Sequence, residues 1–172
     1  MTALPSSFDP AVVPRALAGR KIDQVCFVVE DLEKAIETWS PIYDGEWRVY
    51  TYTPENVHNL LYRGKPGTFR LRLALAGSSP QIELIQPLEG PSIYHDWIDV
   101  HGYGLHHFGF FVPDVAESIR EFEAAGIPNI QSGNGYGLDG DGGFAYFDLE
   151  GTHQLVLEAI EIPKRRRASE QL

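Results

Sequence analysis

Hydrophobic and polar residues follow the same order twice along this chain. The stretch IDQVCFVVEDLEKAIETW, residues 22–39, opens with an alternating strand, continues through an acidic turn and ends in a helical pattern. The stretch LHHFGFFVPDVAESIREF, residues 105–122, repeats that order. A period of two is typical of a strand, and a spacing of three to four is typical of a helix. Each stretch therefore predicts a strand followed by a helix, and the registers match when Gln24 is aligned with His107.

Further strand-like segments follow each predicted helix. They lie at residues 46–53, 69–76, 81–86, 144–147 and 154–160. Residues 54–67 and 132–143 are rich in proline, glycine or asparagine and predict loops, and residues 148–151 predict a turn. The order of elements predicts an α+β fold built from two βαβββ modules.

The two modules suggest a division of the chain into five segments. These are an N-terminal arm at 1–20, the first module at 21–88, a linker at 89–104, the second module at 105–160 and a basic polar tail at 161–172. The linker contains the pattern of a short helix. The tail carries the run Lys164-Arg165-Arg166-Arg167 and is expected to be solvated.

Composition limits the class of protein and its partners. The chain has 172 residues, 43% of them hydrophobic, which is enough for a packed core. No apolar run approaches the roughly 18 residues of a membrane helix, so we expect no membrane partner. The net charge of -10 argues against a general nucleic-acid binder. A single cysteine excludes an intrachain disulfide and favours a protein of the reducing cytoplasm. The expected partner is a small-molecule substrate.

Four residues form a candidate metal-binding set. Gln24 and His107 begin matching strands, while Glu83 and Glu158 lie among apolar residues in the last strand of each half. An unpaired carboxylate is costly in apolar surroundings, which favours a functional role for both glutamates. A repeat that places such donors at equivalent points can bring them together on one ion. Two negative charges would balance a divalent ion, and the mixed N/O set suits Zn, Ni, Co, Mn or Mg.

Several motifs resemble one known superfamily. The segments IDQVCFVVEDLEKA, QIELIQPLEGPS, GYGLHHFGFFVPDV and LVLEAI resemble those of the vicinal oxygen chelate proteins, which include glyoxalase I, methylmalonyl-CoA epimerase, extradiol dioxygenases and bleomycin-resistance proteins. The resemblance implies a cupped mixed sheet and, as is usual for this fold, a homodimer. It also implies one metal ligand at the head of the first strand and one in the fourth strand of each module. Those positions are Gln24, Glu83, His107 and Glu158.

The resemblance also implies a type of reaction. Residues 81–112 are most similar to methylmalonyl-CoA epimerase, whereas Gln24 stands where the epimerases have His. The Gln/Glu/His/Glu set resembles that of the eukaryotic type of glyoxalase I. The expected activity is that of a metal-dependent isomerase, epimerase or lyase. The ion would polarise a substrate carbonyl, and Glu158 or Glu83 would move the adjacent proton through an enediolate.

Two other functions fit the same fold. One is a non-catalytic protein that binds a small molecule in an aromatic cup. The other is a ring-cleaving dioxygenase, although such iron sites use two histidines and the inferred set has only His107. The loop at 133–143 lacks a phosphate-binding motif and predicts a lid or a flexible connection.

The sequence leaves more than one role open for several residues near the four candidate ligands. Strand alternation predicts that His106 faces away from His107 and serves packing or supports the site. Cys26 shares the face of Gln24 and is expected to be a buried structural thiol. Four further side chains lie on strands that either line the cup or face solvent: Tyr50, Tyr52, Arg70 and Arg72.

Overall fold

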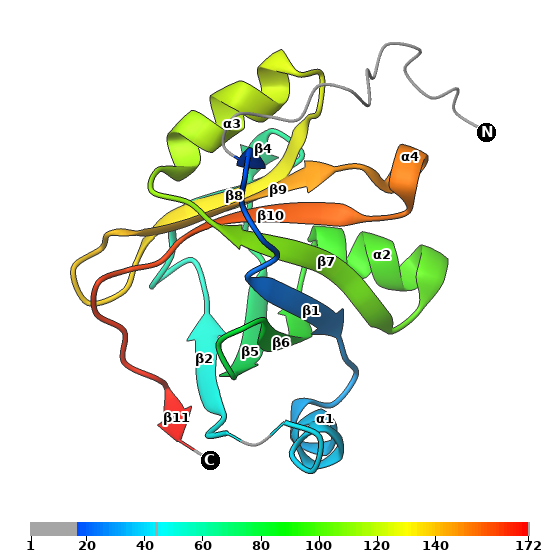
Figure 1. The fold of residues 1–172 in the computed structure, drawn as a ribbon, viewed down its shortest axis with the longest axis vertical. Helices are drawn as coiled ribbons and strands as arrows, with labels where there is room; N and C mark the ends of the chain where they lie inside the picture. The colour runs from blue at the N-terminus through cyan, green and yellow to red at the C-terminus, as the bar shows by residue number, and fades with distance from the viewer. Residues whose placement is uncertain (1–16, 44, 172) are drawn as a thin grey trace.

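The computed structural model describes residues 17–43 and 45–171, and its strands form one mixed sheet (Figure 1). The sheet has 11 strands in the order β11-β2-β5-β6-β1-β7-β10-β9-β8-β3-β4. The strands are β1 (Gln24–Val28), β2 (Arg48–Tyr52), β3 (His58–Tyr62), β4 (Lys65–Pro66), β5 (Arg70–Ala76), β6 (Gln81–Glu89), β7 (Gly104–Phe111), β8 (Asn129–Tyr136), β9 (Gly142–Asp148), β10 (Val156–Glu161) and β11 (Glu170–Gln171). The helices are α1 (Leu32–Trp39), α2 (Ile93–His101), α3 (Val115–Ala124) and α4 (Glu150–His153).

The two halves of the sheet are arranged alike around its centre. β1 and β7 pair with each other in antiparallel orientation. β1 pairs in parallel with β6, and β7 pairs in parallel with β10. Antiparallel strands continue outward from both, through β5 to β2 and through β9 to β8. The predicted α+β fold with a curled mixed sheet is therefore confirmed.

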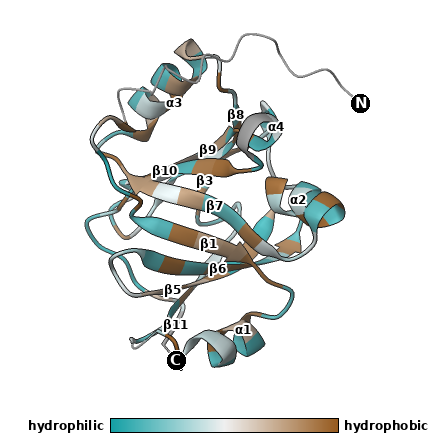
Figure 2. Ribbon diagram, turned by 45° about the vertical axis from the view of Figure 1, so that its right-hand side comes forward, coloured by the Kyte–Doolittle hydropathy of each residue, from teal (hydrophilic) through white to brown (hydrophobic). Residues whose placement is uncertain are grey.

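The two longer outer helices start in the same way. Asp31 accepts a hydrogen bond from the backbone N–H of Lys34, and Asp114 accepts one from that of Glu117. Such aspartate caps satisfy amide groups that have no partner within the helix. Both helices pack on the outside of the sheet (Figure 2), α1 against β5 and β6 and α3 against β8, β9 and β10. The repeated caps account for the repeated strand-to-helix pattern in the sequence.

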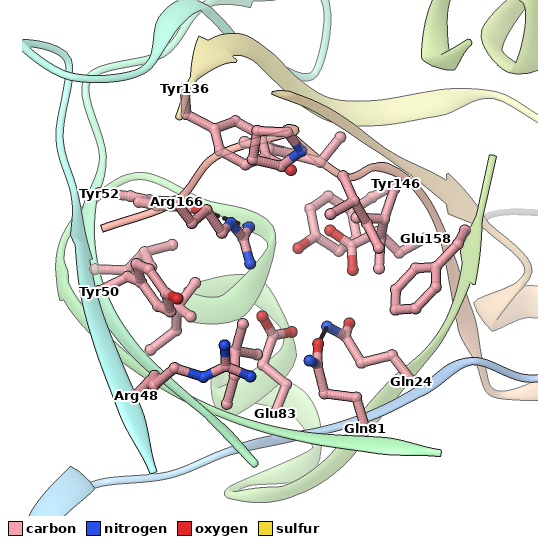
Figure 3. Close-up of a pocket in the computed structure, with 18 of the residues that line it drawn as sticks. Gln24, Arg48, Tyr50, Tyr52, Gln81, Glu83, Tyr136, Tyr146, Glu158 and Arg166 are labelled. Atoms are coloured by element: carbon pink, nitrogen blue, oxygen red, sulfur yellow. Dashed lines mark hydrogen bonds between the residues drawn. The ribbon is translucent and has the colours of Figure 1, made fainter. Parts of the chain in front are cut away.

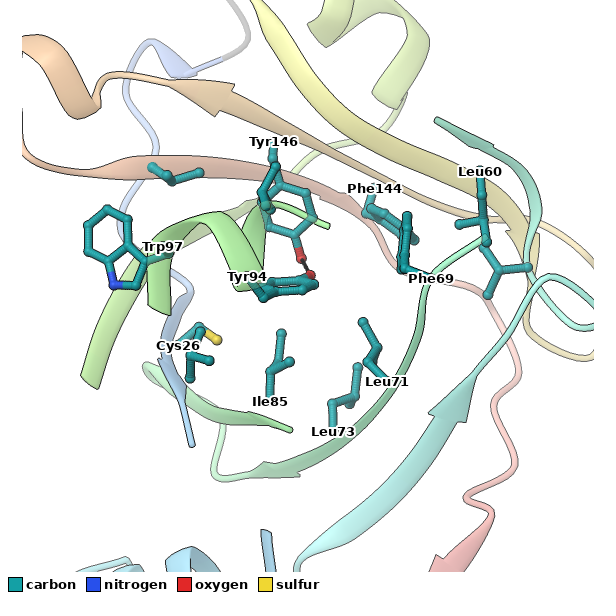
Figure 4. Packing of buried hydrophobic residues seen from close by; sticks show 14 of the residues in the cluster. Cys26, Leu60, Phe69, Leu71, Leu73, Ile85, Tyr94, Trp97, Phe144 and Tyr146 are labelled. Atoms are coloured by element: carbon teal, nitrogen blue, oxygen red, sulfur yellow. Dashed lines mark hydrogen bonds between the residues drawn. The ribbon is translucent and has the colours of Figure 1, made fainter. Parts of the chain in front are cut away.

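The helix α2 closes one end of the cup from inside. Its side chains Ile93, Tyr94 and Trp97 are buried in the same cluster as Ile85 and Tyr146 on the concave face (Figure 4). The short helix expected in the linker is thus present and adds to the core.

Two segments expected to be loops contribute strands. Residues 54–67 contain β3 and β4, and β3 pairs with β8 of the other half. Residues 132–143 include the end of β8. The glycine signal was misleading here, because a Cβ on Gly133 would lie 2.8 Å from Leu60 and 2.8 Å from Phe144. Glycine at 133 allows close packing within the sheet, a known use of glycine in strands. The turn expected at 148–151 is replaced by the start of α4.

The basic tail lies along the body, while Lys164, Arg165 and Arg167 stay exposed to solvent. β11 pairs with β2, and the N–H of Ser169 donates to the carbonyl of Val49 at 2.8 Å. At the other end Arg165 forms an ion pair with Asp139, and the N–H of Leu138 donates to the backbone carbonyl of Arg165 at 3.0 Å. Residues 163–171, here called the strap, therefore link the β8–β9 loop to β2 (Figure 1). The expected solvated run therefore holds for Lys164, Arg165 and Arg167 but not for half-buried Arg166, because the long-range contacts that place the strap leave no local pattern.

Two further expectations concern the N-terminal arm and membrane-spanning helices. Most of the N-terminal arm predicted at 1–20 lies outside the described residues. In the part that the structure describes, no helix is long and apolar enough to cross a membrane.

Candidate metal centre and substrate cavity

The four candidate ligands come from the four central strands of the sheet. Gln24 lies on β1, Glu83 on β6, His107 on β7 and Glu158 on β10. Cys26 is the register partner of both Glu83 and His107 in the neighbouring strands. Every member of this quartet is at most 5% exposed. The structure thus brings together on the concave face all four residues that the sequence singled out.

The imidazole of His107 lies between the two carboxylates. Its Nε2 is 3.0 Å from Oε2 of Glu158 and 3.3 Å from Oε2 of Glu83. Nevertheless this buried nitrogen has no well-aligned hydrogen-bond partner in the described part of the chain. Distance alone does not make a hydrogen bond, and neither carboxylate lies along the ring N–H direction. The nitrogen is directed at a point that it shares with both carboxylates.

The side-chain amide of Gln24 has the orientation that a cation would favour. Its Nε2 donates to Oε1 of Gln81 at 3.1 Å (Figure 3). Its oxygen then lies 3.3 Å from Oε2 of Glu83 and 3.1 Å from Oε2 of Glu158. Three acceptor oxygens facing one another repel, and protein contacts alone would favour the reversed amide. A divalent cation among them removes the conflict, so the donor set fits an oxygen- and nitrogen-ligated metal ion.

Burial and mutual contact shift the protonation of the quartet. Burial lowers the pKa of His107, but the nearby carboxylates of Glu158 and Glu83 outweigh it and raise that pKa to about 9. Burial raises the pKa of Glu158, against the opposing effect of His107. The metal-free cluster therefore keeps a proton at neutral pH. A metal ion has to displace that proton in order to bind.

His106 corrects one expectation from the sequence. β7 pairs His107 with Cys26 but Leu105 with Phe27, so His106 is the extra residue of a bulge. Bulges interrupt alternation, and the prediction that His106 faces away from His107 was wrong for this reason. The two Nδ1 atoms lie 2.9 Å apart. If Nδ1 of His107 carries the hydrogen, His106 accepts it and Nε2 of His107 is free to bind an ion.

The side chain of Cys26 lies beside the quartet. Ligand atoms of Cys26, Glu83 and His107 all lie within 4.8 Å of one another, a spacing at which they could hold a metal ion. Burial, followed by the charges of Glu83 and Glu158, raises the pKa of the Cys26 thiol well above its usual value. A thiol with a raised pKa resists forming the thiolate that ligates metals. Cys26 therefore acts as a buried neutral neighbour of the quartet.

A cavity of about 310 Å³ opens above the quartet (Figure 3). Its wall is rich in tyrosine and branched aliphatic side chains, and the hydroxyls of Tyr94 and Tyr146 lie 2.7 Å apart. The lining includes Gln24, Arg48, Tyr50, Tyr52, Leu71, Leu73, Leu75, Gln81, Glu83, Tyr94, Phe111, Tyr136, Phe144, Tyr146, Glu158, Ile160, Ile162, Pro163, Lys164 and Arg166. The wall is therefore mixed, with apolar side chains interspersed among tyrosines and charged or amide groups.

The structure also decides which strand residues face the cup. Tyr50 and Tyr52 line the cavity. Arg70 instead pairs with Glu55 and Glu89, and Arg72 pairs with Glu33 of the outer helix α1. The two arginines therefore serve the outer face and not the site.

Sequence reasoning missed three polar residues of the cavity. Arg48 shares the strand face of Tyr50 and Tyr52, and that alternation was the signal that could have revealed it. Gln81 precedes Glu83 by two residues and so shares its face. Arg166 belongs to the strap, and only its place in a basic run marked it. These residues supply the amide partner of Gln24 and two cations.

Comparisons with solved structures support the fold. A hypothetical protein of Bacillus halodurans C-125 superposes with a TM-score of 0.61 at 18% identity, covering 87% of this chain and 99% of its own. Methylmalonyl-CoA epimerase of Mycobacterium tuberculosis gives a TM-score of 0.57 at 20% identity, covering 90% and 95%.

A variant of the Streptomyces coelicolor epimerase in complex with 2-nitronate-propionyl-CoA gives a TM-score of 0.59 at 19% identity, covering 86% and 98%. No curated protein matches the chain by sequence. The model of the Glyoxalase/Bleomycin resistance protein/Dioxygenase superfamily matches residues 23–147, most of the described chain, and the chain therefore belongs to that superfamily.

Proposed function

We propose that this protein is a divalent-metal-dependent isomerase, epimerase or lyase that acts beside a substrate carbonyl. The observation that carries the proposal is the orientation of the quartet. The side chains of Gln24, Glu83, His107 and Glu158 converge on a common point, with two negative charges to balance the ion. A bound ion would polarise the carbonyl and stabilise the enediolate that forms when the adjacent carbon loses a proton.

Glu158 is the residue best suited to move that proton. Burial raises the pKa of its carboxyl group, and a base with a raised pKa is more effective at neutral pH. The carboxylate would take the proton from the carbon next to the carbonyl. It would return the proton to another face or to another carbon. The first outcome is epimerisation and the second is isomerisation.

Three apolar side chains of the cavity wall shield part of the site from water. Leu71, Leu73 and Phe144 are buried and line the cavity close to the quartet. Low-polarity walls strengthen electrostatic interactions at the reacting atoms and limit side reactions. The hydroxyl pair of Tyr94 and Tyr146 adds a donor near Glu158. The chain itself thus supplies the base, its positioning and a partly apolar wall.

Metal analysis and proton exchange test the proposal together. The protein purified with a divalent salt is expected to hold about one ion per chain. In deuterated buffer it should exchange a proton of methylmalonyl-CoA or of the methylglyoxal–glutathione adduct. Glu158→Gln should abolish this exchange, whereas Glu161→Gln, on the same strand but directed at α3, should not. Absence of a bound ion after metal supplementation would overturn the proposal.

Binding without turnover is the second candidate, and the aromatic lining favours it. Tyr50, Tyr52, Tyr136 and Phe144 offer stacking surfaces for a planar ligand. Such a function does not need the quartet. Tight binding of an aromatic compound that survives both a chelator and Glu83→Ala would favour this candidate over the enzyme.

A further inference from the structure

The strap delivers one arginine into the cavity. Residues 163–171 run between the β8–β9 loop and β2, and Arg166 is half-buried midway along them. Its guanidinium donates to the hydroxyl of Tyr52 at 2.7 Å. It also lies 4.9 Å from the ring centre of Tyr50 and 5.1 Å from that of Tyr136. Three tyrosines therefore fix the position of this cation.

These contacts hold the guanidinium without neutralising it. In the described part of the chain no carboxylate lies within ion-pair distance of Arg166, and its buried Nε has no hydrogen-bond partner. Other arginines are paired, since Arg63 contacts Asp96 and Arg165 contacts Asp139. A desolvated cation without a counter-charge is costly. The structure therefore leaves a positive charge at the cavity that a ligand can satisfy.

A second arginine reaches the same space from β2. Arg48 lines the cavity, is exposed and forms no ion pair with any residue that the structure describes. Figure 3 shows its guanidinium and that of Arg166 directed into the cavity, with Tyr50 between them and Glu83 nearby. Lys164 adds a third basic group to the lining. A cluster of cations here is notable in a chain whose net charge is -10.

The polar groups of the cavity thus form two separate sets. With a divalent ion bound, the charges of Glu83 and Glu158 are balanced, and Arg48 and Arg166 remain as uncompensated charges. Arginine presents a planar fork of donors that fits carboxylate and phosphate oxygens. A cavity of about 310 Å³ accepts a small molecule or the reacting end of a larger one.

We propose that the substrate of this site carries a carboxylate or phosphate group, which Arg166 and Arg48 bind while its carbonyl end lies at the quartet. The proposal rests on the proposed function for the carbonyl end alone. The anion contact itself needs no metal ion. The proposal assigns Arg166 and Arg48 as specificity-determining residues.

Calorimetric titration of the metal-free protein tests the anion contact separately from catalysis. The probes are benzoylformate as carboxylate, dihydroxyacetone phosphate as phosphate, and the neutral methyl ester of benzoylformate as control. At least one anionic probe is expected to bind about tenfold or more tightly than the ester, as expected for hydrogen bonds to a charged group. The stronger of the two anions identifies the type of acid group. Equal binding of all three probes would overturn the proposal.

Variants of the basic residues complete the test. Arg166→Gln should reduce binding of the preferred anion about tenfold or more, and Arg166→Lys should restore part of it. Arg48→Gln changes an exposed side chain and tests the same contact if Arg166→Gln does not fold. Arg167→Gln, the neighbouring strap arginine that does not line this cavity, should have no effect. Unchanged anion binding in both Arg166→Gln and Arg48→Gln would contradict the assignment.

A metal titration of the same variants separates this proposal from the proposed function. Arg166→Gln and Arg48→Gln should still bind one divalent ion, because the quartet is intact. If the wild type binds the anion but no ion, the metal-dependent function fails and the anion site stands. If the wild type binds the ion but no anion, the anion site fails and the metal-dependent function stands.

Discussion

Gln24 and His107 hold equivalent places in the two halves of the chain, yet they are not partners across the strands. Gln24 lies opposite Gly109, and His107 lies opposite Cys26. The offset places the two side chains next to each other along the central strand pair instead of face to face. It also leaves a glycine directly across from the amide of Gln24.

Gly109→Ala is expected to weaken metal binding without unfolding the protein. A Cβ at Gly109 would lie 3.0 Å from both Cβ and Oε1 of Gln24 and 2.8 Å from Cδ1 of Ile160. The 2.8 Å contact requires the end of Ile160 to move, and the 3.0 Å contacts require Gln24 to shift by a few tenths of an ångström, which displaces its amide from the quartet. Calorimetric titration with Mn²⁺ or Zn²⁺ would show the loss. Gly143→Ala is the matched control, because its nearest neighbour would be 3.5 Å away.

Metal uptake should release a proton at neutral pH. Glu158 and Glu83 overcome burial and raise the pKa of His107 to about 9, so the metal-free protein carries a proton there below that pH. The ion has to displace it, and the apparent affinity should fall about tenfold for each pH unit below 9. Titration in two buffers with different ionisation enthalpies measures the released proton. Identical heats at pH 7 would contradict the prediction.

His106→Phe is expected to lower metal affinity although His106 is not among the proposed ligands. The variant removes the acceptor that holds Nδ1 of His107 at 2.9 Å. Loss of such a supporting contact typically costs about 10- to 100-fold in affinity. His101→Asn, which removes the surface contact with Glu150 and the ring contact with Trp97 but not the contact with His107, serves as control in the same titration. Equal metal affinity of His106→Phe and wild type would show that the contact has no orienting role.

Phe147→Ala should destabilise the fold and leave the site intact. Its ring is fully buried and stacks on Phe122 at 3.7 Å and 7°, under the outer helix α3. Removing a buried phenylalanine costs about 3–5 kcal/mol. Urea denaturation should show a lower free energy of unfolding. The metal content per folded chain should stay the same, and its loss would mean that this core supports the quartet directly.

Asp139→Asn is expected to loosen the strap. The change removes the ion pair with Arg165, a surface contact worth up to about 1 kcal/mol. Trypsin should then cleave the basic run of the strap up to about fivefold faster under native conditions. Asp96→Asn breaks a comparable ion pair with Arg63 far from the strap and should not change this rate. A rate that is the same in both variants would show that the ion pair does not hold the strap.

The sequence was sufficient for the centre of the fold because its signals there are local. Alternation and aspartate caps predicted β1, α1, β7 and α3, and the repeat of that pattern aligned Gln24 with His107. The apolar neighbours of Glu83 and Glu158 marked them as unusual carboxylates. The four residues consequently met as expected.

The missed features depend on contacts between distant segments. The turn-forming residues around β3 predict a loop, and the strand forms because it pairs with β8 of the other half. The bulge at His106 arises from the register between β1 and β7, which no single strand encodes. Arg166 reaches the cavity only because the strap is held at both ends. Charge and periodicity within one segment carry no information about contacts with distant segments.

The strap has a consequence for how this architecture can diversify. The proposed metal-binding quartet is drawn from the four innermost strands, whose register is constrained on both sides, whereas the proposed anion contact uses Arg48 of β2 and Arg166 of residues 163–171. Exchanging that short stretch would alter which acid group is recognised while the chemical centre is retained. The two proposals together predict that substrate choice and reaction type can be varied separately in the laboratory.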